Sequence, residues 1–178
     1  MEDEVEDPRS GQRLVFRRVG GDVLELDLFI SPGAFVREHV HPSQEERFSG
    51  VAGAFVLDVD GSMHTIRPGD TVVIPPRTPH SFEAAAEAAH LLVTVHPALQ
   101  LDGYFRVFLG LSRAGRLRIP ARGMPRPLLL FAVLMHRYRR EIAVSGVPLW
   151  LQRPLWWLLA RVGRLRGHRA AYPEYGAP

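Results

Sequence analysis

Turn signals recur at short intervals between positions 14 and 96, and this spacing constrains the fold more than any other feature. Glycine, proline and aspartate cluster at Gly20-Gly21-Asp22, Ser31-Pro32-Gly33 and Pro68-Gly69-Asp70, and Asp60-Gly61 separates two β-rich runs as in a tight hairpin. Short strand-like runs between such turns favour an antiparallel sandwich or barrel. The expected strands are 14–19, 23–30, 35–41, 47–51, 54–59, 63–67, 71–74, 81–84 and 90–95.

The sequence changes character after Pro97. Apolar residues now recur three and four positions apart, as they do on one face of an α-helix. Prolines and glycines interrupt this pattern twice, so we expect helices over 101–112, 128–142 and 149–165. The chain is therefore expected to comprise a mobile, acidic N-terminus at 1–8, a mainly β barrel at 9–98 and a helical, arginine-rich extension at 99–178.

Charge is distributed unevenly between the two main parts. The net charge of +3 combines −8 over residues 1–100 (8 Arg, 16 Asp plus Glu) with +11 over residues 101–178 (14 Arg, 3 Asp plus Glu). All 22 basic residues are arginine. Such an asymmetry indicates two segments with different roles, or two halves that dock on each other.

Composition excludes several classes of protein. The chain contains no cysteine, which removes disulfides, thiolate catalysis and cysteine-ligated zinc sites. The acidic start lacks the basic residues and apolar run of a secretory signal. The longest uncharged apolar stretch near the C-terminus, Pro127 to Met135, is shorter than the ~20 residues that span a bilayer. We expect a cytoplasmic protein, with peripheral membrane contact left open.

Two stretches carry residues suited to metal chemistry. His39 and His41 are two positions apart on an expected strand, so their side chains share one face. A turn at Pro42-Ser43 would bring Glu46 back towards them. A third histidine, His80, stands where a later strand begins. Neutral imidazoles with one carboxylate suit a divalent transition metal such as Fe, Mn, Ni, Co, Cu or Zn.

These stretches resemble the two motifs of the cupin family. The first motif, G-x5-H-x-H-x(3–4)-E-x6-G, is matched in full by Gly33, His39, His41, Glu46 and Gly53. The second motif, G-x5-P-x-G-x2-H-x3-N, is matched by Gly69, Pro75 and His80. Arg77 and Ala84 replace its glycine and asparagine, neither of which is a metal ligand in the family. The resemblance covers residues 14–98.

The resemblance implies a double-stranded β-helix, or jelly-roll barrel, with one divalent metal inside. His39, His41, Glu46 and His80 are implied as its ligands, leaving one or two coordination positions open for chemistry. Glu46 is preferred over Glu45 because only Glu46 leaves six residues between itself and Gly53. A detached Glu46 could also shuttle a proton, which makes it the candidate catalytic residue.

Four further side chains are candidates for the substrate pocket. By strand parity, Phe35 and Arg37 share the face of His39 and His41, and Arg37 could anchor an anionic or carbonyl group. The alternative is an Arg37 that meets solvent or an acidic neighbour at the barrel mouth. Phe48 and Phe82 are expected to line the cavity as packing residues. The remaining histidines are expected to be structural or solvated.

The segment 149–166 mixes bulky apolar residues with arginines and allows three interpretations. Its helix could pack on its own barrel or on a second subunit of a homodimer. It could lie in a membrane interface, with tryptophan rings at headgroup depth and arginines towards anionic lipid. Nucleic-acid binding is the least favoured interpretation, because no known reading motif accompanies the charge.

Three hypotheses for function follow. The leading one is a metal-dependent oxygenase acting on a small organic molecule. The first alternative is an isomerase or cyclase in which the metal polarises a carbonyl as a Lewis acid. The second is a non-catalytic module that binds a small molecule, with its basic, tryptophan-rich tail docked on a partner or a membrane. A metal-binding barrel by itself does not decide among them.

Overall fold

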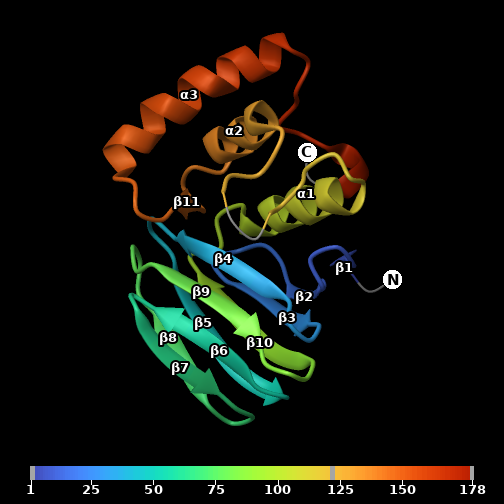
Figure 1. Ribbon diagram of the computed structural model, residues 1–178, viewed down its shortest axis with the longest axis vertical. Helices are drawn as coiled ribbons and strands as arrows, with labels where there is room; N and C mark the ends of the chain where they lie inside the picture. The colour runs from blue at the N-terminus through green and yellow to red at the C-terminus, as the bar shows by residue number, and fades with distance from the viewer. Residues whose placement is uncertain (1–2, 121–122, 177–178) are drawn as a thin grey trace.

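The computed structural model describes residues 3–120 and 123–176, and in it two antiparallel sheets face each other beneath a cap of helices (Figure 1). The six-stranded sheet has the order β1-β2-β3-β10-β5-β8, and the five-stranded sheet has the order β11-β4-β9-β6-β7. The strands are β1 Glu4–Asp7, β2 Gln12–Arg18, β3 Leu24–Ile30, β4 Phe35–Val40, β5 Glu45–Ala52, β6 Phe55–Val59, β7 Ser62–Ile66, β8 Thr71–Ile74, β9 His80–Ala84, β10 Ala89–His96 and β11 Ala143–Val144. The expected jelly-roll class, with helices following it, is confirmed.

Alternation of side chains along the strands builds the barrel core. In β3, every second side chain is buried from Leu24 to Ile30, and β10 repeats the pattern from Leu91 to Val95. Because successive strand residues point to opposite faces, these apolar rows all line the space between the sheets. Phe48, Phe55 and Phe82 fill its centre, with ring centroids 5.4–6.2 Å apart.

The N-terminal segment differs from expectation. Residues 1–8 were expected to be mobile and solvated, but Glu4–Asp7 forms β1 and pairs with β2 from Val15 to Gln12. Asp7 is fully buried, and its carboxylate accepts a hydrogen bond from the Arg9 backbone at 3.1 Å. Pairing with a strand edge outweighs the acidic composition that suggested disorder. Met1 and Glu2 lie outside the described residues.

The helical part contains α1 Leu101–Arg113, α2 Leu128–Arg137, α3 Leu149–Leu165 and the 3₁₀ turn η1 Pro173–Tyr175. The first and third match their expected ranges closely, but α2 ends five residues before the expected Ile142. After Tyr138 the chain turns and reaches Glu141, which is buried and accepts a bond from the Gln100 backbone at 3.3 Å. Among the helices in the described ranges, none combines the length and apolarity needed to cross a bilayer.

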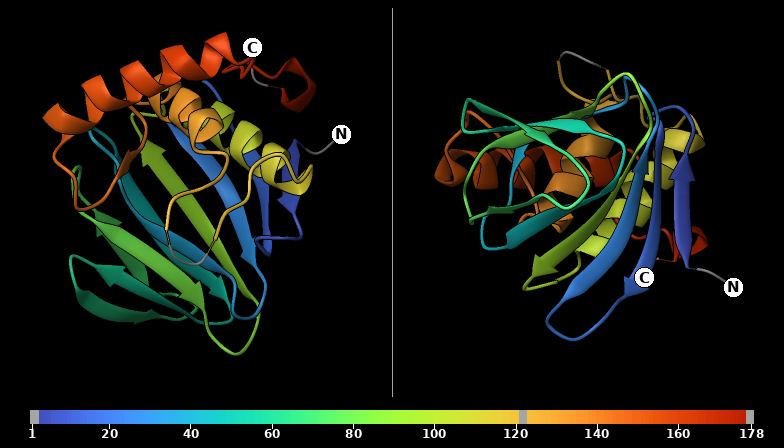
Figure 2. Two further views of the ribbon diagram at one scale, coloured as in Figure 1. Left: turned by 45° about the horizontal axis from the view of Figure 1, so that its top comes forward. Right: turned by 90° about the horizontal axis from the view of Figure 1, so that it is seen from below.

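The hydrophobic core continues across the expected boundary at residues 98–99. Leu101, Tyr104 and Val107 of α1 belong to the same buried cluster as the barrel side chains. The short strand β11 joins the five-stranded sheet by pairing with Val40 and His39. The helices close one end of the barrel (Figure 2). The helical segment is thus integrated with the barrel, and it reaches the strand that carries His39.

Candidate metal centre

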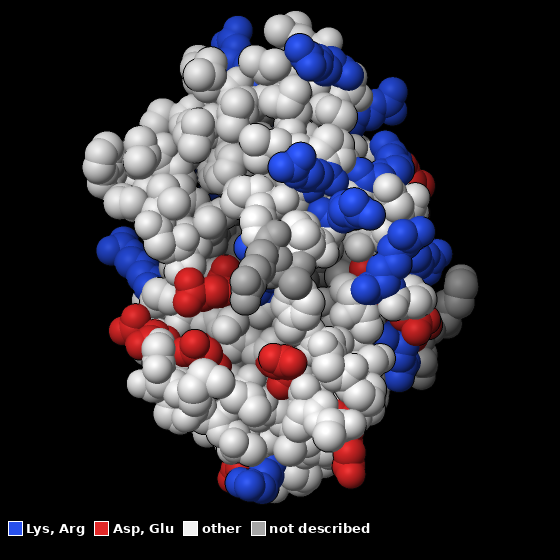
Figure 3. Space-filling model, viewed as in Figure 1, with Lys and Arg blue, Asp and Glu red and all other residues white. Residues whose placement is uncertain are grey.

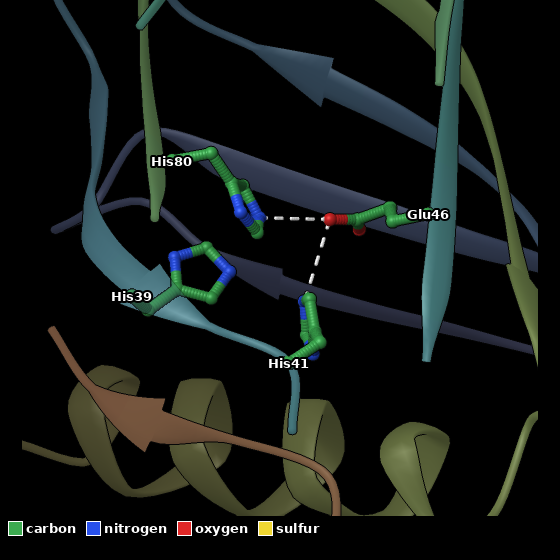
Figure 4. A group of neighbouring side chains, drawn as sticks. All are labelled: His39, His41, Glu46 and His80. Atoms are coloured by element: carbon green, nitrogen blue, oxygen red, sulfur yellow. Dashed lines mark hydrogen bonds and ion pairs between the residues drawn. The ribbon is translucent and has the colours of Figure 1, made fainter. Parts of the chain in front are cut away.

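Four side chains from three neighbouring segments converge between the two sheets (Figure 4). His39 lies in β4 and His41 follows directly after it, His80 opens β9, and Glu46 faces them from β5. Their ligand atoms all lie within 4.8 Å of one another. Bends at Pro42 and Ser43 reverse the chain so that Glu46 points inward and is buried, whereas Glu45 points outward and is exposed.

A backbone carbonyl fixes the orientation of each imidazole. A carbonyl oxygen can only accept, so each Nδ1 carries a proton and donates it, and Nε2 is the nitrogen that each ring aims at the centre of the cluster. Two of the carbonyls come from the residue two positions earlier, and the third comes from the segment after α2. The bonds are His39 to Arg37 at 2.8 Å, His80 to Thr78 at 3.0 Å and His41 to Glu141 at 2.6 Å.

The donor set fits a metal ion. Nε2 of His80 lies 3.0 Å from Oε2 of Glu46, and Nε2 of His41 lies 3.3 Å from the same oxygen. With Nδ1 donating to a carbonyl, a neutral ring would place its Nε2 lone pair against this carboxylate, and either a proton on Nε2 or a shared cation makes the contact favourable. Within the described residues, Nε2 of His41 is also a buried polar atom without a hydrogen bond. Three imidazoles and a carboxylate suit a first-row transition metal.

Electrostatic effects keep His39 neutral and Glu46 ionised, which are the forms that bind a metal. Burial, with the neighbouring His80 and His41, lowers the pKa of His39 well below 6.5, so this imidazole is neutral. Burial alone would raise the pKa of Glu46, but His41 and His80 outweigh it and lower the pKa well below 4.5. Burial also opposes a charge on His41, yet the adjacent Glu46 carboxylate leaves the pKa of His41 raised. At neutral pH the carboxylate is ionised, as a metal ligand must be.

The departure from the second motif at Arg77 has a visible conformational cost. Arg77 has φ +67°, a left-handed conformation in which glycine is unstrained. Its backbone N–H donates to the His41 carbonyl at 2.8 Å, and its Nε donates to the Pro42 carbonyl at 3.4 Å. Arg77 therefore adopts a backbone conformation suited to the glycine of the motif. Its hydrogen bonds tie the segment before His80 to the segment that contains His41.

We expect Arg77→Gly to raise the free energy of unfolding by up to about 1 kcal/mol, because relief of the left-handed strain exceeds the extra entropy of the unfolded chain. Urea unfolding of the two proteins measures the difference. Arg67→Gly is the matched control: Arg67 is exposed and has no positive φ, so glycine there should destabilise. A less stable Arg77→Gly protein would contradict the assignment of strain.

Strand parity does not place Phe35 and Arg37 on the face of His39, because β4 contains an irregularity, but both residues line the groove described below together with His39. Val36 pairs with Phe82 and His39 pairs with His80, so two residues of β4 lie opposite a single residue of β9. The extra residue places Val36, rather than Phe35, on the face of His39. Arg37 donates to the backbone carbonyls of Pro120, at 3.3 Å, and Gly123. Its guanidinium is thus held by the loop after α1.

Phe48 and Phe82 lie directly beside the cluster. Each follows a ligand by two positions, Phe48 after Glu46 and Phe82 after His80, so both side chains point into the barrel. The Phe48 ring meets the His80 imidazole edge-on with centroids 6.4 Å apart. They form an apolar wall against the ligands. The other barrel histidines lie elsewhere: His90 bonds to Asp27 at 2.6 Å and His96 to Asp22 at 2.7 Å.

A groove of about 860 Å³ runs along the edge of β4, between that strand and the helices, and His39 lines it. Sequence reasoning missed this groove because its far wall comes from the extension. Apolar periodicity predicted the helices but not which face would meet β4. The Glu141 carbonyl was also missed, and no side-chain pattern could have revealed it. The groove aromatics are Phe35, Tyr104, Phe105, Phe108 and Phe131.

Comparison with known proteins agrees with this architecture. A family model described as a cupin domain matches residues 28–95. Protein SchB of Streptomyces halstedii is 36% identical over 43% of this chain, and the match spans 66% of that curated relative's length. An RmlC-like cupin from Shewanella frigidimarina superposes with a TM-score of 0.51 at 23% identity, over 55% of this chain and 86% of that chain. KdgF from Halomonas sp. superposes with a TM-score of 0.49 at 23% identity, over 52% of this chain and 84% of that chain.

The matched range contains everything that defines the site within the barrel. It runs from β3 to β10 and includes all four convergent side chains. The likeness to the Shewanella frigidimarina structure bears on the fold, in which two antiparallel sheets enclose the cluster. Residues 28–95 therefore form a cupin domain, and the chain shares the fold of an RmlC-like cupin.

Proposed function

We propose that this cupin is a metal-dependent enzyme of the oxygenase type that acts on a small, largely apolar organic molecule. The observation that carries the proposal is that His39 takes part in two features of the structure. It belongs to the four-residue cluster, and it also lines the groove of about 860 Å³. A groove lined by a candidate ligand offers a substrate a binding place beside the centre, which a closed structural metal site would not need.

The groove suggests the class of substrate. Its walls carry the aromatic side chains named above together with Met124 and Met135, which favour flat, apolar molecules. Arg9 and Arg118 also line it and can attract a carboxylate or an enolate. A conjugated compound that bears one acidic oxygen, such as a phenol or a diketone, combines both properties.

The chain's own residues divide the work of such a reaction. His39, His41, His80 and Glu46 would hold the ion, and the three backbone carbonyls would keep the imidazoles aimed at it. A bound transition metal would supply activation of dioxygen or polarisation of a substrate oxygen. Glu46, if released from the ion, can hold a proton on its carboxylate. Phe48 and Phe82 exclude water from the inner side of the cluster.

A second candidate function is isomerisation or cyclisation of a carbonyl compound, and Tyr104 favours it. Tyr104 lines the groove, and burial raises its pKa above 10.0, so the hydroxyl stays protonated at neutral pH. A protonated hydroxyl can donate a hydrogen bond to a substrate carbonyl or enolate oxygen. Such a donor assists Lewis-acid chemistry and does not require dioxygen.

One experiment separates these functions. The full-length protein is purified, its metal content is measured, and it is supplied with phenols, diketones and sugars in air and under argon. We expect about one transition-metal ion per chain, as in other mononuclear sites. We further expect turnover of a phenol or diketone with consumption of dioxygen. Turnover under argon would favour the isomerase. Ligand binding without turnover of any compound would overturn the enzyme proposal in favour of a binding module.

A further inference from the structure

Helix α3 has one face buried against the rest of the protein. Gln152, Trp156, Ala160 and Gly163 are its buried residues. The Trp156 ring meets the Phe131 ring of α2 edge-on, with centroids 5.8 Å apart. Gly163 allows the helices to touch, because a Cβ added there would lie 2.8 Å from the Leu129 carbonyl oxygen. The buried face therefore packs on α2 and bonds to β11 through Gln152 and Val144, and α3 is the outermost helix of the cap (Figures 1 and 2).

The opposite face of α3 is apolar and exposed. Trp150 is 75% exposed and Leu165 is 89% exposed, at the two ends of the helix. At 100° per residue, the exposed apolar side chains fall on one side of the helix, opposite the packed side. Single exposed apolar residues are common, but a continuous apolar face marks a binding surface. We call this set the outer face: Trp150, Leu151, Leu155, Trp157, Leu158, Val162 and Leu165.

Arginines border the outer face. Helical geometry places Arg153 and Arg164 along one edge and Arg166 at the other, while Arg161 lies within the face and stacks on Trp157 at 5.1 Å. None of the four has an ion pair within residues 3–120 and 123–176. No acidic residue occurs between Glu141 and Glu174. In Figure 3, blue and white cover the end of the molecule that carries α3, and most red lies over the barrel.

We propose that the outer face of α3 binds the surface of an anionic lipid bilayer, with the helix lying in the membrane plane. Apolar side chains would enter the acyl boundary, and the tryptophans would sit at headgroup depth, where a ring with one polar atom is most stable. The bordering arginines can extend to lipid phosphates while their aliphatic stems cover apolar surface. The inference is independent of the function proposed for the metal centre.

Charge favours lipid over a second copy of this chain as the occupant. Two copies that met through their outer faces would bring eight arginines together with no carboxylate between them, and like charges in an interface oppose association. An anionic bilayer instead supplies phosphates on both sides of the apolar strip. The unneutralised arginines thus match the membrane and not the same face of a partner subunit.

The test is flotation of full-length protein with vesicles of phosphatidylcholine alone or mixed with phosphatidylglycerol. We expect flotation with the mixed vesicles only, weakened by high salt. The triple variant Trp150→Ser, Leu158→Ser, Leu165→Ser should lose at least about tenfold in partition coefficient, because buried apolar area is removed. Replacing Arg161 and Arg164 with glutamine should cost roughly fivefold per arginine. Met63→Ser, an exposed apolar site on the barrel, should float like the wild type.

Folding of each variant is checked by its melting transition, which should match the wild type because only exposed side chains change. Failure of the wild-type protein to float with anionic vesicles would overturn the proposal, as would undiminished flotation of the triple variant. Sedimentation of the same proteins tests the other occupant. A wild-type dimer that the triple variant converts to a monomer, without flotation of either, would assign the outer face to a subunit interface instead.

Discussion

Replacing His41 and His80 together with alanine is expected to reduce the bound transition metal from about one ion per chain to background. The two imidazoles supply half of the ligand set, and both approach the same Glu46 oxygen, at 3.3 and 3.0 Å. A pair consisting of His39 and Glu46 is too small a set to hold an ion against water. Elemental analysis of gel-filtered protein, grown and purified in parallel with the wild type, measures the loss.

Two comparisons make this result specific. The double variant His64→Ala, His96→Ala removes two exposed barrel histidines outside the cluster and should keep its metal. Glu46→Gln nearly preserves side-chain shape, so it removes the charge of the ligand without opening a cavity, and it should weaken metal binding by tenfold or more. If the His41, His80 variant kept wild-type metal, the ion would reside elsewhere and the cluster would be an internal ion-pair network.

Gly53→Ala is expected to prevent folding or to destabilise the protein by more than about 4 kcal/mol. Gly53 has φ +68°, and a Cβ built on it would lie deep inside the contact distance of the Ala88 carbonyl oxygen and 3.0 Å from the Ala89 Cα. These are backbone atoms at the start of β10, so they cannot rotate away. Yield of soluble protein and urea unfolding measure the effect.

Gly61→Ala is the matched control for this clash. Gly61 has φ +82°, yet an added Cβ there would meet nothing within 4 Å. Both substitutions carry the left-handed penalty of about 1–2 kcal/mol, and only Gly53→Ala adds the collision. Equal destabilisation of the two variants would show that the approach of Ala88 is not rigid.

The β part of the fold was predictable because its signals are local. Turn residues and alternating apolar positions marked each strand between 12 and 96 to within two residues or fewer at either end. The N-terminal strand was not predictable, because Glu4–Asp7 has an acidic sequence and becomes a strand only by pairing with β2. The end of α2 was likewise set by distant contacts: the Glu141 segment bonds to His41 and to Gln100, and the helix stops before it.

The candidate metal centre was predictable for a different reason. Its four side chains lie on barrel strands whose spacing is read directly from the sequence, and the structure brings the same four together. The groove was not predictable, since it depends on how helices pack on a strand edge. The strand face predicted for Phe35 and Arg37 is wrong because one inserted residue between Val36 and His39 reverses the parity of the residues before it, although both residues line the groove.

The carbonyl that orients His41 belongs to Glu141, a hundred residues further along the chain. During translation, all four ligand side chains leave the ribosome while the third anchoring carbonyl is still unsynthesised. A nascent chain that ends near Ala98 therefore contains the carbonyls that orient His39 and His80 but lacks the one that orients His41. Correct loading with metal should accordingly be a late event in biogenesis, following the arrival of β11.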